Sequence, residues 1–184
     1  MARRRPRRDR APREKPALDA KAAKLAAFDL LARKSWSRAE LTRRLKRRGA
    51  PDEIARAVVA ELTERGYVDD ADFARWWAEA RARGRKVGSV RLRRELAARG
   101  IPATLAASAV GAAFEDTPES ERAMEAARRR LPALLRGHPE RAPARLRDYL
   151  LRRGYPAALV IAVTKRLLAD RIADPETADD DGAV

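Results

Sequence analysis

The sequence contains no cysteine, a single histidine and few aromatic residues, and each shortage excludes a class of protein. Without cysteine the chain can form neither a disulfide nor a thiolate metal site, and His138 alone cannot complete a histidine cluster for a metal. No stretch approaches the roughly 20 apolar residues that a membrane-spanning helix needs. We therefore expect a soluble protein of the reducing cytoplasm, without membrane association and without a metal or other cofactor.

The residues that are present favour helices. Hydrophobic residues make up 45% of the chain and aromatic residues only 5%, so a core must be built mainly from alanine, leucine and valine. Alanine, leucine, arginine and glutamate are strong helix formers, and β-branched residues are few. The composition predicts an all-α fold with essentially no sheet.

The 184 residues carry a formal net charge of +15, which indicates a polyanionic partner such as nucleic acid or an acidic protein surface. The charge is unevenly spread, because residues 1–15 hold eight basic and two acidic side chains, whereas the last twelve hold five acidic and no basic ones. Both ends lack apolar runs. We expect a disordered basic arm over residues 1–18 and a disordered acidic tail over residues 173–184.

One spacing, Leu-x-x-x-Leu-x-x-x-Gly-x-Pro, occurs three times, beginning at Leu41, Leu92 and Leu146. Two leucines one turn apart predict the buried face of a helix, the glycine predicts a left-handed helix end, and the proline predicts the start of another helix. We call the helix that carries a leucine pair the marked helix of its repeat. A further helix is expected before each marked helix. The pattern predicts an elongated array of three tandem three-helix repeats of helix-turn-helix type, over residues 19–68, 69–115 and 116–172, which stack on one another as a monomer.

The marked helix of the first repeat and the helices that precede the marked ones have further signals. Ser37 can cap the first marked helix with Glu40 three residues on, and Asp69 or Asp70 can cap the helix that opens the second repeat. The side chains expected to be buried on the three preceding helices are Leu25, Phe28 and Leu31 or Ala32; Phe73, Trp76, Trp77 and Ala80, with room for one exposed tryptophan; and Met124, Ala127 and Leu131.

Basic residues gather on the marked helices and in the "RARGRKVG" segment, which reads as a loop. The planar fork of arginine suits bidentate contact with phosphate or carboxylate. A solvated face explains any single arginine equally well, but the clusters favour a contact surface for an anion. The candidate binding residues are Arg43, Arg44, Arg47, Arg48, Arg81, Arg83, Arg85, Lys86, Arg91, Arg94 and Arg99.

Catalytic patterns are lacking. There is no phosphate-binding loop, no dinucleotide fingerprint, and no serine or cysteine with a plausible histidine base. Asp69, Asp70 and Asp72 have the chemistry to hold Mg²⁺, but their position at a helix start favours capping. We expect no enzyme, and a Mg²⁺-dependent nuclease is the weakest alternative.

Three stretches, "SRAELTRRLKRRG", "ELTERGYVDDADFARWWAEARARG" and "VGSVRLRRELAARGI", together resemble the RecX family of bacterial recombination regulators. The resemblance covers residues 20–114 and, more weakly, 117–170. The matching positions are Ser37, Glu40, Leu41, Gly66, Tyr67, Val68, Asp69, Asp70, Phe73, Ala74, Arg81, Gly84, Gly88, Leu92, Leu96, Gly100 and Ile101.

The resemblance implies an all-helical repeat protein that binds the RecA filament on single-stranded DNA and modulates it, usually by inhibition. RecA-dependent ATP hydrolysis, strand exchange and LexA cleavage would be affected, and with them recombination, DNA repair and the SOS response. Many members also bind DNA. The alternative from the residues alone is a helix-turn-helix-type repeat protein that binds DNA directly and acts without RecA.

Overall fold

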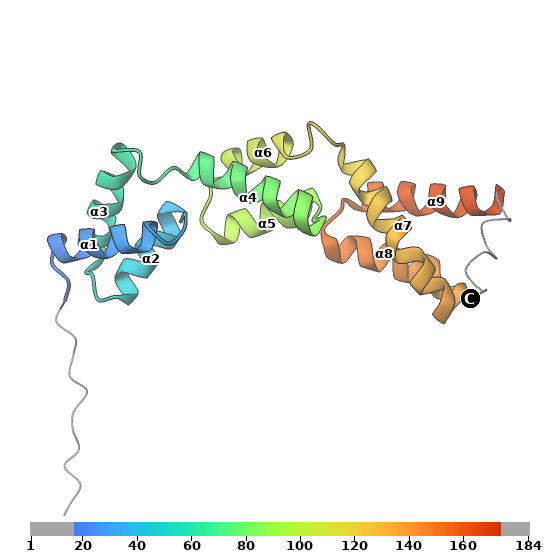
Figure 1. Ribbon diagram of the computed structural model, residues 1–184, viewed down its shortest axis with the longest axis horizontal. Coiled ribbons are helices and arrows are strands. Elements are labelled where there is room, and N and C mark those ends of the chain that lie inside the picture. The colour runs from blue at the N-terminus through green and yellow to red at the C-terminus, as the bar shows by residue number, and fades with distance from the viewer. Residues whose placement is uncertain (1–16, 174–184) are drawn as a thin grey trace, which may run out of the picture. The chain divides into compact units, whose positions relative to one another are not determined.

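The computed structural model describes residues 17–173, and within that range it contains nine α-helices, one 3-10 turn and no strand (Figure 1). This confirms the all-α prediction. The helices are α1 Ala20–Leu31, α2 Arg38–Arg47, α3 Asp52–Glu64, α4 Asp70–Arg85, α5 Ser89–Ala98, α6 Ala103–Ala112, α7 Glu119–Gly137, α8 Ala142–Arg153 and α9 Ala157–Ala173, with the 3-10 turn at Pro139–Arg141. Nearly all of the expected basic arm and acidic tail lies outside the described residues. No helix in the described range has both the length and the apolar character needed to cross a bilayer.

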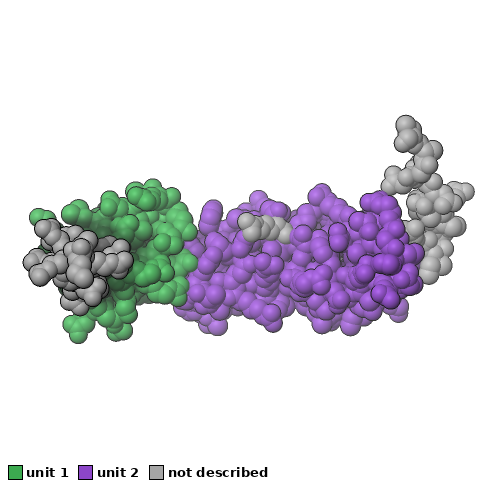
Figure 2. Space-filling model, turned by 90° about the horizontal axis from the view of Figure 1, so that it is seen from below, with its two compact units in different colours: residues 1–68 green, residues 69–184 purple. Residues whose placement is uncertain are grey.

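The chain divides into two compact units, residues 1–68 and residues 69–184, which Figure 2 shows in green and purple. The first unit holds helix set 1 (α1 to α3), and the second holds helix set 2 (α4 to α6) and helix set 3 (α7 to α9). Each set surrounds its own cluster of buried side chains. The sets follow the order of the expected repeats, and the domain limits 19–68, 69–115 and 116–172 stay a prediction.

The repeated leucine pairs form the centre of each core. Six leucines at matching positions are fully buried, namely Leu41, Leu45, Leu92, Leu96, Leu146 and Leu150. Burying one leucine side chain contributes roughly 2 kcal/mol. The glycines that follow have φ angles of +103° at Gly49, +80° at Gly100 and +87° at Gly154, so each ends its helix in the left-handed conformation as predicted.

The predicted helix caps are also present. The Ser37 hydroxyl accepts a hydrogen bond from the Glu40 amide at 3.1 Å, which starts α2. Asp69 starts α4 by accepting from the amides of Ala71 at 2.7 Å and Asp72 at 3.1 Å. Each such cap contributes about 1 kcal/mol. Asp69 is therefore engaged with the backbone of α4.

The buried face predicted for α1 is partly wrong. Leu25 is 61% exposed, and Ala32, the alternative to Leu31, lies beyond the end of the helix at Leu31 and is exposed. Its core face is formed by Ala23, Ala27 and Leu30, while Phe28 and Leu31 are half-buried beside it. The small alanines let α1 approach α3 closely, and this close packing decides which face turns inward.

The predicted stripe on α4 needs the same correction. Phe73 is buried and Trp77 half-buried, as expected, but Ala80 is exposed and Trp76 is the exposed tryptophan. The side of α4 that faces α6 is completed by Ala74, Ala78 and Ala82, which are fully buried. On α7, Ala127 and Leu131 are buried and Met124 is half-buried, and the helix continues through Pro132 to Gly137.

Candidate basic contact surface

Four of the predicted binding residues lie on α2, in the first unit. The Arg44 guanidinium lies over the Trp36 ring, 3.6 Å from its centroid, and Arg48 donates a hydrogen bond to the Ala26 carbonyl at 3.2 Å. Arg43 and Arg47 are exposed, one turn apart, and neither pairs with a carboxylate among the described residues. These two arginines present their charge to solvent.

On the second unit, three predicted arginines belong to a network around Glu95 and Trp77. Glu95 pairs with Arg81 at 2.9 Å and with Arg91 at 3.0 Å, and it accepts a hydrogen bond from the Trp77 indole at 3.3 Å. Arg99 lies over the Trp77 ring at 3.6 Å. Burial raises the pKa of the Glu95 carboxyl, but the hydrogen bond from Arg91 and the charge of Arg81 outweigh burial and leave this pKa below its usual value.

The remaining predicted binding residues differ in whether they form ion pairs. Arg83 pairs with Glu79 at 3.0 Å and Asp116 at 3.1 Å, and the Lys86 ammonium pairs with Glu125. The hydrogen bond from Lys86 lowers the Glu125 pKa. Arg94 is exposed and has no ion-pair partner in the described part of the chain. The side chain of Arg85, at the end of α4, lies outside the described residues.

The segment read as a basic loop is in fact the end of α4 followed by a joint between helix sets 2 and 3. The amide of Gly88 donates to the Arg153 carbonyl at 2.9 Å, and that of Val90 to the Gly154 carbonyl at 3.0 Å. A Cβ on Gly88 would lie 2.5 Å from the Gly154 carbonyl, so only glycine fits here. The atoms that lie close to Gly88 are therefore backbone atoms of the protein itself.

Two residues that the sequence patterns did not single out hold the same joint. The Tyr155 hydroxyl, on a side chain only 2% exposed, donates to the Lys86 carbonyl at 3.0 Å. Arg122 is 7% exposed and donates to the carbonyls of Ala113 at 3.1 Å and Thr117 at 3.2 Å. No local sequence pattern distinguishes Arg122 from the other basic residues of the chain, because its hydrogen-bond partners lie in the connection that precedes α7.

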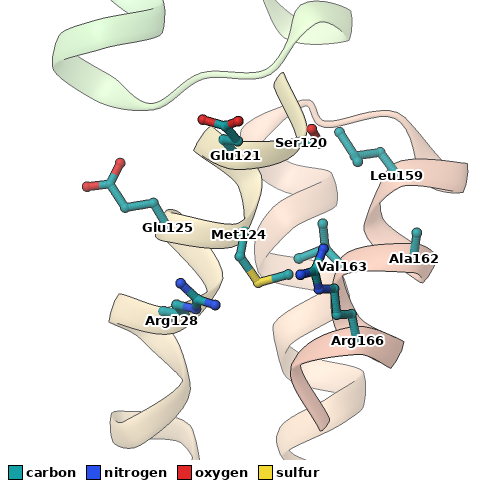
Figure 3. Close-up of a pocket in the computed structure, with 9 residues that line it drawn as sticks. All are labelled: Ser120, Glu121, Met124, Glu125, Arg128, Leu159, Ala162, Val163 and Arg166. Carbon is teal, nitrogen blue, oxygen red and sulfur yellow. The ribbon is translucent and has the colours of Figure 1, made fainter. Parts of the chain in front are cut away.

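A groove of about 560 Å³ lies between α7 and α9 (Figure 3). Met124 and Arg128 of α7 face Val163 and Arg166 of α9 across it, and Glu121 and Glu125 of α7 also belong to its lining. Its two arginines are matched by two glutamates, so it offers no net charge to an anion. Among the described residues no three carboxylate or histidine side chains are grouped to hold a metal ion.

Comparison with known proteins gives consistent matches. Residues 23–62 match the family profile described as "RecX, first three-helix domain" and residues 69–110 match "RecX, second three-helix domain". The chain is 33% identical over 160 residues to the regulatory protein RecX of Amycolatopsis mediterranei, covering 87% of this chain and 91% of that one. It is 38% identical over 147 residues to the regulatory protein RecX of Thermobifida fusca, covering 79% and 78%.

The fold is also that of solved structures. The crystal structure of RecX from Lactobacillus salivarius superposes with a TM-score of 0.72 over 80% of this chain and 96% of that chain, at 15% sequence identity. At that identity the superposition supports the fold alone.

Proposed function

The chain belongs to the RecX family of regulatory proteins, and on that premise we propose that it binds the RecA filament on single-stranded DNA and inhibits it. Inhibition lowers RecA-dependent ATP hydrolysis, strand exchange and LexA cleavage, and so restrains recombination, repair and the SOS response in the cytoplasm. Family membership supports the regulatory role, and the charge of +15 supports a partner with acidic protein and phosphate on its surface.

One observation supports the contact surface most directly. Arg43 and Arg94 occupy the same repeat position, two residues after the first buried leucine, and both are exposed and free of any carboxylate in the described range. In the part of the chain that the structure describes, these two arginines carry unpaired positive charges at matching positions of two repeats. They can therefore make two similar contacts with a repetitive anionic partner such as a filament. Helix set 3 departs from this pattern, since Asp148 occupies the position there.

The proposal is tested by reversing these two charges. The double variant Arg43→Glu, Arg94→Glu should bind RecA filaments at least about tenfold more weakly, because two attractive contacts become repulsive. Binding is measured by co-sedimentation with filaments formed on single-stranded DNA. The matched control is Arg33→Glu, Arg147→Glu, which makes the same charge change at one exposed arginine in each unit. Equal binding by both variants would remove Arg43 and Arg94 from the contact surface.

Direct binding of duplex DNA through α2 and α5 is the alternative that uses the same side chains. It requires tight duplex binding without RecA, with a logarithmic salt dependence of about −0.9 per phosphate contacted. The same two variants, titrated with duplex DNA alone, distinguish this alternative from filament binding.

A further inference from the structure

Three hollows adjoin one another inside the second unit. The first two lie along the seam between helix sets 2 and 3, and the third lies between α7 and α8 of helix set 3. Their volumes are about 440, 470 and 260 Å³. The first and second share Lys86 and Arg129 as lining residues, and the second and third share Tyr149. The hollows therefore form a run of three neighbouring recesses.

The lining of this run is strongly basic. It includes nine basic side chains against three acidic ones, and no acidic side chain lines the middle hollow. Glu125 is shared between Lys86 and Arg129, with 2.8 Å to the latter, so one carboxylate faces two cations. Arg145 and Arg152 are exposed and form no ion pair with any residue of the described range. The run of hollows keeps a positive excess that internal pairing does not cancel.

Three of these basic residues, Lys86, Arg130 and Arg153, are ordered by their neighbours. Lys86 has a φ of +49°, an uncommon conformation for a lysine, and the Tyr155 hydroxyl fixes its carbonyl. Burial raises the pKa of Tyr155 to about 12, so this hydroxyl keeps its proton and remains a donor at neutral pH. The Tyr149 ring supports the guanidinium groups of Arg153 at 4.8 Å and Arg130 at 5.7 Å. Cations ordered in advance lose less entropy when an anion binds.

We infer that this run of hollows is a binding track for the sugar-phosphate backbone of a single-stranded nucleic acid, which passes the exposed arginines of α7 and α8. A series of adjoining basic hollows matches a flexible chain with one charge per nucleotide. Duplex DNA, with a persistence length of about 50 nm, does not bend into successive recesses. A protein partner is disfavoured because the lining lacks the large apolar anchors that dominate protein interfaces.

The track does not depend on the proposed action on RecA, since its test contains no RecA. Fluorescence anisotropy measures binding of the full chain to an oligothymidylate of about 16 nucleotides over a range of salt concentrations. The test variant is Arg129→Gln, Arg145→Gln, Arg152→Gln. The matched control is Arg136→Gln, Arg147→Gln, Lys165→Gln, which removes the same charge from exposed positions of α7, α8 and α9 outside the hollows. Far-UV circular dichroism checks that both remain helical.

The track variant should bind on the order of tenfold more weakly, and the slope of log K against log salt should become shallower by about 2, since a single strand releases about 0.7 counterion per phosphate contacted. The control should bind as the parent does. Equal weakening of both variants, or no weakening of the track variant, would overturn the track. So would tighter binding of a duplex of equal length, or equally effective competition by polyglutamate at matched charge, which would indicate an acidic protein as the partner.

A second pair of variants tests the support given by Tyr149. Tyr149→Phe keeps the ring under Arg130 and Arg153 and should bind the oligonucleotide as the parent does. Tyr149→Ala removes that ring and should weaken binding several-fold, again with helicity checked. Parent-like binding by a folded Tyr149→Ala variant would contradict the organised track.

Discussion

Gly88 and Gly154 meet backbone to backbone, so that a Cβ added to Gly88 would lie 2.5 Å from the carbonyl carbon and oxygen of Gly154. Gly88 follows α4 and Gly154 ends α8, so the contact joins helix sets 2 and 3. The hydrogen bonds from Gly88 and Val90 lie beside it. These two glycines therefore allow helix sets 2 and 3 to come into backbone contact within the second unit.

Substituting Gly88 should loosen this joint. Gly88→Ala forces a methyl group into backbone and should lower the free energy of unfolding by about 1 to 3 kcal/mol, as overpacking does. Gly84→Ala is the matched control, because its Cβ would meet no atom within 4 Å and it lies inside α4, where alanine should stabilise by up to about 1 kcal/mol. Urea denaturation followed by circular dichroism measures both. A destabilisation of equal size in the two variants would contradict the contact.

The leucine pairs should dominate stability. Leu96→Ala removes a fully buried side chain and should cost about 2 to 5 kcal/mol of unfolding free energy. Leu25→Ala, at a side chain that is 61% exposed, should change it by less than about 0.5 kcal/mol. The denaturant midpoints of the two variants, compared with that of the parent, measure these two losses of stability. A large loss at Leu25 would restore the α1 face expected from the sequence.

Glu95 should make the free energy of unfolding depend on pH in the acid range. The pKa of Glu95 in the folded protein lies below the ordinary value of 4.5. The contribution of Glu95 to the free energy of unfolding is therefore fully present above pH 4.5 and is lost as the pH falls through the lower pKa of the folded protein. Glu95→Gln should destabilise the protein by about 1 kcal/mol at pH 7, because Arg81 and Arg91 lose their shared partner.

The pH profile separates Glu95 from the other carboxylates that are lost in acid. Thermal unfolding from pH 7 to pH 3 should show the gap between the parent and Glu95→Gln narrowing as the pH falls below 4.5. The isosteric amide leaves packing unchanged, so a gap of constant size at all pH values would mean that the charge of Glu95 contributes nothing.

Local signals predicted the helices and their ends well. The leucine pairs, the left-handed glycines and the caps at Ser37 and Asp69 depend on residues within a few positions of one another, so spacing alone specifies them. The faces of α1 and α4 were harder, because alanines such as Ala23 and Ala78 contribute little to an apolar stripe yet allow the closest helix packing.

The candidate surface could be predicted only in part. Charge clustering identified Arg43 and Arg94, which remain exposed, but it could not show that Arg81 and Lys86 pair with carboxylates from other helices. The meeting of Gly88 with Gly154, and the role of Tyr155 at Lys86, join residues from different repeats. Such contacts have no local sequence pattern and require the fold.

The most direct test of inhibition is RecA-catalysed ATP hydrolysis dependent on single-stranded DNA, titrated with this protein at physiological salt and with DNA in excess. Excess DNA suppresses simple competition for DNA, so a regulator that acts on the filament should lower hydrolysis at substoichiometric amounts relative to RecA. A fall that appears only when the protein is abundant enough to coat the DNA, and that added DNA reverses, would contradict action on the filament.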